Sequence, residues 1–301
     1  MENAGEQNRG STHKAMELHL IPPRHYEPDS EQLLYHYCSP ETFLAICTGQ
    51  KLRFCDIFSM NDYLESHWGY RVWEQAATNL IDVVGRDFLD QVDAVISGAS
   101  LRSLPLASCL SLNGDVLSQW RAYSHDGIGF SVGFSGNALK TLPVRALSVC
   151  YEEGQQVKEV TACVRALHSL LEKEPENEDQ FFELAFSLAV DLSSYKNPAF
   201  AEEGEVRLVH VINFTPSGNS MKLVDPGGRE GYAPQPVKFF MKNGCPVPHL
   251  DIPFMEPNLD NPIKKVVVGP KNDSLSAGIS VFLETCGIPD VEVIRSAASY
   301  R

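Results

Sequence analysis

The sequence predicts an α+β fold, a single domain in which mixed or antiparallel sheets are flanked by helices. Two observations lead to this class. Of the 301 residues, 43% are hydrophobic and 21% are charged, which is the composition of a folded globular chain. Segments with strand and helix patterns do not alternate regularly, as they would around a doubly wound parallel sheet. The chain contains no internal repeat.

The first elements follow a polar N-terminal segment. Residues 1–32 are irregular and contain three prolines, so we expect a flexible arm. The domain then begins with an aromatic strand at 33–37. A helix follows that strand, because Ser39 can cap it, Pro40 suits its first position and Gly49 can end it.

A long helical region comes next. Asp62 and Glu65 have the spacing of a capping box at a helix N-terminus. Apolar residues then recur at helical spacing to about residue 97, which predicts one helix or two helices broken near Gly85.

The remaining segments complete a domain that spans residues 33–301. Two helices with an acidic connection form a helical insert at about 155–195. Further strands are expected at about 51–57, 105–112, 129–134, 144–151, 205–214, 237–241, 264–268 and 291–294, and a last helix at 272–286.

Charge and hydropathy restrict the partners. The chain has 39 acidic and 25 basic residues, a net charge of -14, which disfavours broad binding to a phosphate backbone but leaves a local basic groove open. No stretch approaches the roughly 20 apolar residues of a membrane span. The polar start has no apolar core of a secretory signal, so we expect a cytoplasmic protein without a membrane partner. The eight scattered cysteines fit free thiols.

Two polar blocks in the first half are candidate site segments. In the first strand, alternation directs His36 away from Tyr35 and Tyr37, and the histidine is either a hydrogen-bonded core residue or a site residue. Asn61, Asp62 and Glu65 form the second block. They either cap a helix or face a cleft, where a helix N-terminus attracts anions.

Two further blocks lie in the middle of the chain. Trp120, Arg121 and Tyr123 fall within one helical turn, and they either pack together or offer an aromatic platform and a cation to a flat heterocycle or a phosphate. Glu203, Glu205 and Arg207 share one face at the start of a strand. They are either a solvated edge or a catalytic carboxylate held by a neighbouring cation.

Motifs of other enzyme classes are absent. The sequence has no phosphate-binding P-loop, no H-E-x-x-H and no paired His or Cys spacing, so no metal is predicted.

Taken in order, five blocks from about residue 33 to residue 270 resemble a mostly bacterial family, domain of unknown function 2971. Tyr63 departs from the family's frequent proline, and Cys109 and Leu112 depart from its S-F-S strand and the polar residue that usually follows. The blocks are His36-Tyr37, Asn61 to Glu65, Trp120 to Gly127, Glu203 to Arg207, and Val267 to Pro270.

The order of these blocks is similar to that of ADP-ribosyltransferase-like domains. That resemblance implies an ADP-ribosyltransferase-like core and an enzyme that uses NAD as a substrate, either an ADP-ribosyltransferase or an NAD glycohydrolase, with Glu205, Glu203 and His36 as catalytic residues. It suggests a toxin or anti-phage defence effector, whose acceptor (protein, nucleic acid or small molecule) stays open. The other residues assigned to ligand binding are Tyr37, Ser108, Ser111, Trp120, Arg121, Tyr123, Arg207, Asn61, Asp62 and Glu65.

Two other functions are kept as alternatives. A non-catalytic module could hold a nucleotide or another anionic ligand through Arg121, Arg207 and the helix that begins near Asp62. A nuclease could use the acidic residues to hold Mg²⁺.

Overall fold

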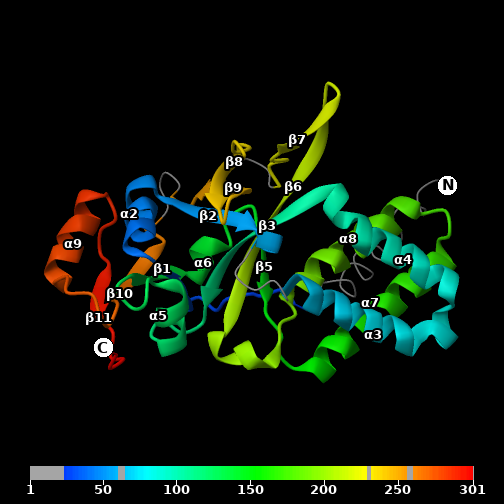
Figure 1. The fold of residues 1–301 in the computed structure, drawn as a ribbon, viewed down its shortest axis with the longest axis horizontal. Helices are drawn as coiled ribbons and strands as arrows, with labels where there is room; N and C mark the ends of the chain where they lie inside the picture. Colours follow the sequence, from blue (N-terminus) through cyan, green and yellow to red (C-terminus); the bar gives the residue numbers. More distant parts are fainter. Residues whose placement is uncertain (1–23, 60–64, 229–231, 256–259, 301) are drawn as a thin grey trace, which may run out of the picture.

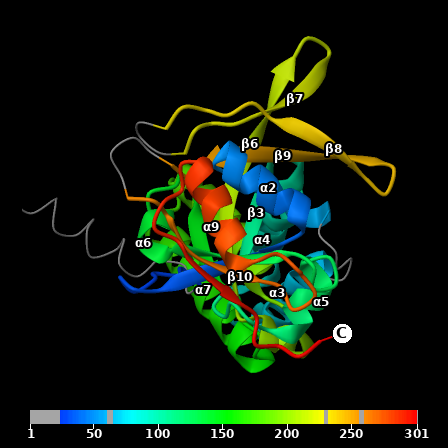
Figure 2. The ribbon, with the colours of Figure 1, turned by 90° about the vertical axis from the view of Figure 1, so that its left-hand side faces the viewer.

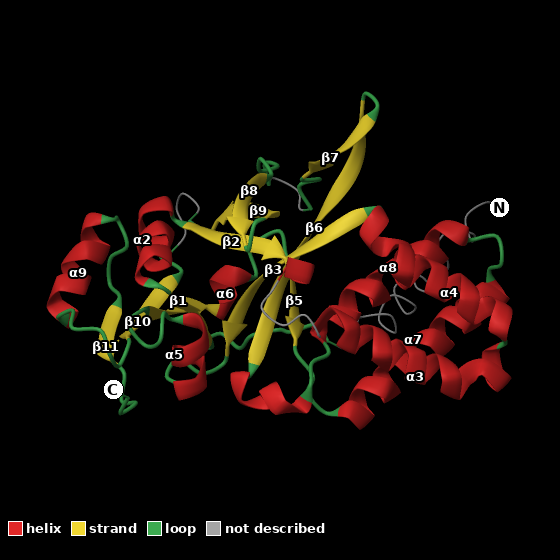
Figure 3. Ribbon diagram, in the orientation of Figure 1, coloured by secondary structure: helices red, strands yellow, loops and turns green. Residues whose placement is uncertain are grey.

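The structure is a computed structural model that describes residues 24–59, 65–228, 232–255 and 260–300. It has the predicted mixed α and β composition. In Figure 1, strands β2, β3 and β6 lie near the centre, helices α3, α4, α7 and α8 gather at one end, and α2 and α9 lie at the other. Figure 3 shows the same division by secondary structure.

The described strands form one open sheet of eleven strands, in the order β11-β10-β4-β1-β3-β2-β9-β8, with β6 paired to β3 and carrying β5 and β7. All pairs are antiparallel except β10 with β11. Two hairpins, β6–β7 and β8–β9, extend from the body (Figure 2). The strands are β1 (Leu33–Cys38), β2 (Lys51–Asp56), β3 (Ser103–Ser111), β4 (Phe130–Ser135), β5 (Arg145–Ser148), β6 (Glu205–Ser217), β7 (Ser220–Val224), β8 (Lys238–Lys242), β9 (Cys245–Pro253), β10 (Ile263–Val268) and β11 (Glu292–Arg295).

The helices follow the predicted order. They are α2 (Pro40–Gly49), α3 (Glu65–Val84), α4 (Arg86–Gly98), α5 (Leu117–Tyr123), α6 (Gly136–Leu139), α7 (Glu153–Lys173), α8 (Glu178–Asp191) and α9 (Ser276–Thr285). Short 3-10 helices are η1 (Ile57–Ser59), η2 (Ala99–Leu101), η3 (Leu192–Ser194) and η4 (Pro198–Glu203). Strands β7 and β9, the short helix α6 and the 3-10 helices were not predicted by the sequence patterns.

Local signals at helix ends are confirmed with one difference. The Ser39 hydroxyl accepts from the Thr42 amide at 3.2 Å, as expected of a cap. Gly85, at φ 82°, separates α3 from α4. Helix α2 does not end with a left-handed Gly49; instead Gln50 adopts φ 50°, and its amide donates to Ile46 O at 2.8 Å.

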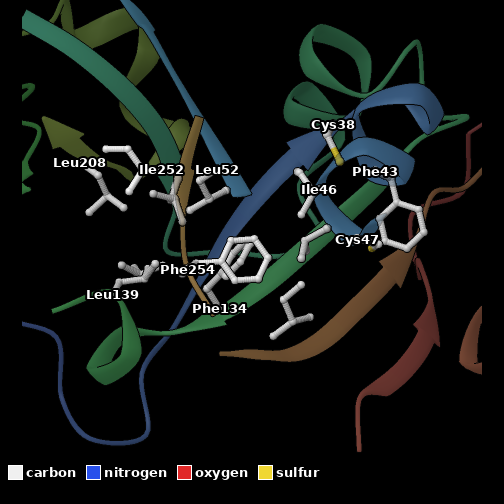
Figure 4. Packing of buried hydrophobic residues seen from close by; sticks show 14 of the residues in the cluster. Cys38, Phe43, Ile46, Cys47, Leu52, Phe134, Leu139, Leu208, Ile252 and Phe254 are labelled. Carbon is white, nitrogen blue, oxygen red and sulfur yellow. The ribbon is translucent and has the colours of Figure 1, made fainter. Parts of the chain in front are cut away.

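The two largest of four hydrophobic clusters among the described residues lie on either side of the centre. The larger core joins the sheet to α2 and α9, and its buried residues include Leu52, Phe134, Leu208 and Phe254 (Figure 4). The second core joins α3, α4, α7 and α8. The two helices of the expected insert are therefore α7 and α8, which share their core with α3 and α4.

The N-terminal boundary differs from the prediction. Residues 24–32, expected in a flexible arm, already contact the fold. Arg24 O accepts from the Ser148 amide at 2.7 Å, and the Tyr26 amide donates to Ala146 O at 2.9 Å. Arg24 also pairs with Glu159 on α7 at 2.5 Å. The segment is thus bound to β5 and α7 before the first strand begins.

None of the eight cysteines, all of which lie in the described residues, forms a disulfide, and Cys38, Cys47 and Cys150 are buried. In the described part of the chain, no helix combines the length and apolarity that crossing a membrane requires.

Candidate functional site

A cavity of about 690 Å³ opens at the centre of the sheet. Its floor comes from β1, β3 and β6, and its walls come from β2, α3, α5, β8 and the segment around η4. The predicted residues that line it are His36, Tyr37, Ser108, Ser111, Tyr123, Glu203, Glu205 and Arg207.

The cavity exists because β1 and β2 share one edge of β3 and then diverge. Strand β1 pairs with β3 at Tyr35 and Ser111, whereas β2 pairs with it at Ala107 and Leu106. Between these pairings, residues 108–110 face the cavity. The sheet is split at this point, and the gap brings residues from opposite faces of the strands to one space.

His36 fills part of the gap between the strands. Its Nδ1 donates to Cys109 O at 2.9 Å, and because a carbonyl only accepts, Nδ1 carries the proton and Nε2 is an acceptor. Burial lowers the pKa of His36, which keeps the ring neutral. Alternation predicted His36 on the face opposite to Tyr35 and Tyr37, but the divergence of β1 lets all three line the cavity.

Four buried charges alternate in sign on the cavity floor. Arg207 holds Glu205 with two hydrogen bonds, Nε to Oε1 at 2.8 Å and Nη2 to Oε2 at 3.0 Å. Lys196 donates to Glu205 Oε2 at 3.2 Å and also pairs with Glu203. Arg207 Nη1 donates to Ser193 O at 2.5 Å, which joins the group to η3. The four side chains are buried, so these residues are not a solvated strand edge.

The charge state of Glu205 follows from this arrangement. Burial alone would raise its pKa, but the Arg207 guanidinium and the Lys196 ammonium outweigh burial and lower the pKa to about 2. Glu205 is therefore an ionised carboxylate throughout the neutral range.

Gly204 brings Glu203 and Glu205 to the same side. Glu203 ends η4, Gly204 adopts φ 49°, and Glu205 begins β6. Glycine adopts this left-handed conformation at little energetic cost, because it has no side chain. The Tyr123 hydroxyl then donates to Glu203 Oε1 at 2.9 Å, and Ser111 Oγ donates to Glu203 O at 2.6 Å.

The Tyr123 hydroxyl is bonded to Glu203, while the residue lines the cavity and is 38% exposed. Burial, together with the Glu203 charge, raises the pKa of its hydroxyl, which stays protonated and donates to the carboxylate. Ser108 Oγ, by contrast, is buried in the cavity lining without a hydrogen-bond partner. That hydroxyl is available to a ligand.

Trp120 and Arg121 are separate from the cavity. The Trp120 ring is fully buried, packs edge-on against Tyr37, and donates from Nε1 to Asp115 at 2.7 Å. Arg121 is exposed, with its guanidinium 5.7 Å from the centre of the Tyr300 ring. Their predicted role as an aromatic platform with a cation does not match these positions, and the alternative of packing does.

Tyr37 has a mixed role. Its hydroxyl donates to Asn113 O at 2.9 Å and accepts from the Val116 amide at 2.8 Å, so it positions the loop before α5 while it lines the cavity. Asn61 and Asp62 lie outside the described residues. Glu65 is the first residue of α3, and its side chain also lies outside the description.

Sequence patterns missed several lining residues. Lys196 follows a helix without any local motif, and only the fold brings its ammonium between Glu203 and Glu205. Arg53 on β2, Arg71 on α3 and Lys242 on β8 also line the cavity, and each comes from a segment with an ordinary element pattern.

Within the described residues, no group of three or more His, Cys, Asp or Glu side chains is placed to hold a metal ion.

One family comparison bears on this site. The family described as "Protein of unknown function (DUF2971)" matches residues 119–208, a segment that holds Tyr123, Lys196, Glu203, Glu205 and Arg207. This match supports the resemblance to domain of unknown function 2971. No curated protein and no solved structure shows a significant match to the chain.

Proposed function

We propose that the chain is an NAD-consuming enzyme of the ADP-ribosyltransferase-like type. It would cleave the bond between nicotinamide and ribose and pass ADP-ribose to water or to an acceptor (a protein, a nucleic acid or a small molecule). The observation that supports this proposal is the position of His36, Tyr123, Glu203 and Glu205 around one cavity. Small-molecule sites are typically about 300–1,000 Å³ in volume, a range that includes this cavity.

The reaction requires negative charge beside the ribose. As the C1–N bond breaks, its electron pair passes to the pyridinium nitrogen, which leaves as neutral nicotinamide, and the ribose becomes oxocarbenium-like. Glu205 is ionised, oriented by Arg207 and buried, so its attraction for the developing cation is stronger than in water. Glu203 is a second carboxylate on the same floor.

His36 supplies the proton acceptor. Water or an acceptor hydroxyl attacks C1 of the ribose and loses its proton as the new C–O bond forms. Neutral His36, protonated on Nδ1, can take that proton on Nε2. The buried Ser108 hydroxyl is available to hold a ribose hydroxyl.

A non-catalytic nucleotide or anion sensor is the second candidate, and the charge of the cavity favours it. Glu203 and Glu205 are already paired with Lys196 and Arg207. Such a module would bind ligand and be stabilised by it without turnover.

A metal-dependent nuclease has less support from the geometry. The oxygens of Glu203 and Glu205 accept from Lys196, Arg207 and Tyr123, and a divalent cation would have to displace these donors. Loss of activity on adding a chelator would favour that alternative.

The test of the proposal is nicotinamide release from NAD by the purified chain, with transfer of labelled ADP-ribose to candidate acceptors. Glu205→Gln should reduce the rate by a hundredfold or more, on the order of a lost charge-stabilising group. Glu202→Gln, an exposed neighbour on η4, is the matched control and should keep the wild-type rate.

Two results would overturn the proposal. One is the absence of both nicotinamide release and transfer in a folded sample. The other is an equal rate in Glu205→Gln and wild type. Expression in bacteria adds a test of the toxin setting, since an active enzyme should lower cellular NAD and arrest growth while Glu205→Gln should not.

A further inference from the structure

Three further cations line the cavity, on the segments that form its wall. Arg53 comes from β2, Arg71 from α3 and Lys242 from β8, and all three line the cavity. None of these three belongs to the segment that matches the family of unknown function.

The charge of the described lining residues is positive. Glu203 and Glu205 are offset by Lys196 and Arg207, so Arg53, Arg71 and Lys242 leave a formal excess of three positive charges. The whole chain has a net charge of -14. A positive concave site within an acidic protein attracts anions and focuses the field on the cavity.

Two of these cations lie beside aromatic rings in the same wall. The Arg71 guanidinium lies 5.3 Å from the Trp68 ring centre, and the Arg53 guanidinium lies 6.0 Å from the Phe240 ring centre. Both rings are partly exposed and line the cavity. Aromatic faces beside guanidinium groups suit a heterocyclic base next to phosphate oxygens.

The wall is held in place from behind. Trp68 Nε1 donates to Gln156 Oε1 at 3.0 Å, and Gln156 Nε2 donates to Lys196 O at 2.8 Å. A buried glutamine on α7 therefore connects the aromatic wall to the lysine of the acidic floor. At Gly69, an added Cβ would lie 2.3 Å from Leu192 O, so only glycine allows α3 to approach η3 this closely.

The two arginines keep capacity for a ligand. Among the described residues Arg71 makes no ion pair. Arg53 pairs with Asp251 at 2.9 Å, but Lys238 also pairs with that carboxylate at 3.0 Å, so one negative charge is shared by two cations. Lys242 donates to Ser59 O at 2.7 Å.

We propose that this wall is a binding subsite for the diphosphate and base of a nucleoside diphosphate moiety. Arg53 and Arg71 would bind the diphosphate oxygens, with Lys242 adding charge, and Trp68 or Phe240 would contact the base. The inference deepens the proposed function, because it assigns the non-reacting half of the substrate to the cavity that holds Glu205, but binding at this wall does not require turnover.

The test is calorimetric titration of the folded chain with ADP, with adenosine as the uncharged comparison. ADP should bind at least tenfold more tightly than adenosine, a difference of about 1.4 kcal/mol or more in binding free energy. The affinity for ADP should fall as salt is raised, because salt screens the attraction between the cations and the diphosphate. Arg71→Gln and Arg53→Gln should each weaken ADP binding about tenfold or more. Arg86→Gln, an exposed arginine on α4 outside the cavity, should leave it unchanged.

The outcomes separate the two proposals. If wild type and Glu205→Gln bind ADP equally but NAD is not cleaved, the subsite stands and the enzymatic proposal fails. If NAD is cleaved but Arg53→Gln and Arg71→Gln keep the wild-type KM and ADP affinity, the subsite is wrong. No ADP binding at millimolar concentration by a chain with a cooperative unfolding transition would also overturn it.

Discussion

Replacing Arg207 by methionine removes the cation that holds Glu205 most closely. Arg207 makes two hydrogen bonds to the carboxylate, and both side chains are buried. Methionine fills much of the same volume without a charge, so Glu205 would keep only Lys196 as a cationic partner. A buried charge that loses its partner is strongly destabilising.

The pKa of Glu205 allows the cost to be worked out. Folding lowers this pKa from 4.5 to about 2. A depressed carboxyl pKa stabilises the fold above the unfolded value, and that stability is lost as pH falls toward the folded value. At about 1.4 kcal/mol per unit, the depression corresponds to about 3 kcal/mol at pH 7, and about 1 kcal/mol remains at pH 3.

The assay is urea unfolding at pH 7 and pH 3. Arg207→Met should lose about 3 kcal/mol or more of unfolding free energy at pH 7, and this loss should shrink by about 2 kcal/mol at pH 3. Arg165→Met, at an exposed position on α7, is the control and should change little at either pH. A loss below about 1 kcal/mol at pH 7, or an equal loss at both values, would refute this account of Glu205.

Four further changes test other parts of the structure. Tyr123→Phe removes the donor to Glu203 Oε1 and should cost about 1 kcal/mol in urea unfolding, with nicotinamide release reduced and ADP binding kept. Asp115→Ala removes the acceptor of the Trp120 indole and of the Ala297 amide. The unfolding free energy should fall by about 1–3 kcal/mol, and amide exchange at residues 296–300 should become faster. Unchanged exchange would contradict this role of Asp115. Leu52→Ala should cost about 2–5 kcal/mol because the side chain is fully buried, whereas Leu44→Ala, 52% exposed, should cost much less. Burial lowers the pKa of His36 below its ordinary value of 6.5, and protonation of Nε2 removes the proton acceptor. As pH is lowered, nicotinamide release should therefore begin to fall only below 6.5. A fall that begins above 6.5 would argue against His36.

Local chemistry in the sequence was sufficient for many elements. The cap at Ser39, the helix break at Gly85 and the apolar strands depend on neighbours a few residues away, so their signals are readable along the chain. Strand β7 was missed because its residues are mostly exposed and pair only with β6, which leaves no apolar alternation.

The candidate site shows where local patterns end. Glu203, Glu205 and Arg207 could be selected because they are adjacent in the sequence. Their burial could not be predicted from the sequence, because it depends on Lys196 and Ser193, which come from the segment after α8. Trp120 was assigned to the site but is a buried core residue. The local sequence does not distinguish an aromatic residue in a core from one on a ligand platform.

The sequence by itself therefore determined the α+β class, the order of most elements and the set of polar residues worth placing in a site. Only the tertiary structure decided which of them meet. The cavity depends on two strands that share an edge of β3 and then separate, and it is lined by cations from β2, α3 and β8. Contacts between residues distant in the chain carry no periodic signal, because they arise from the packing of whole elements and not from the spacing of neighbours.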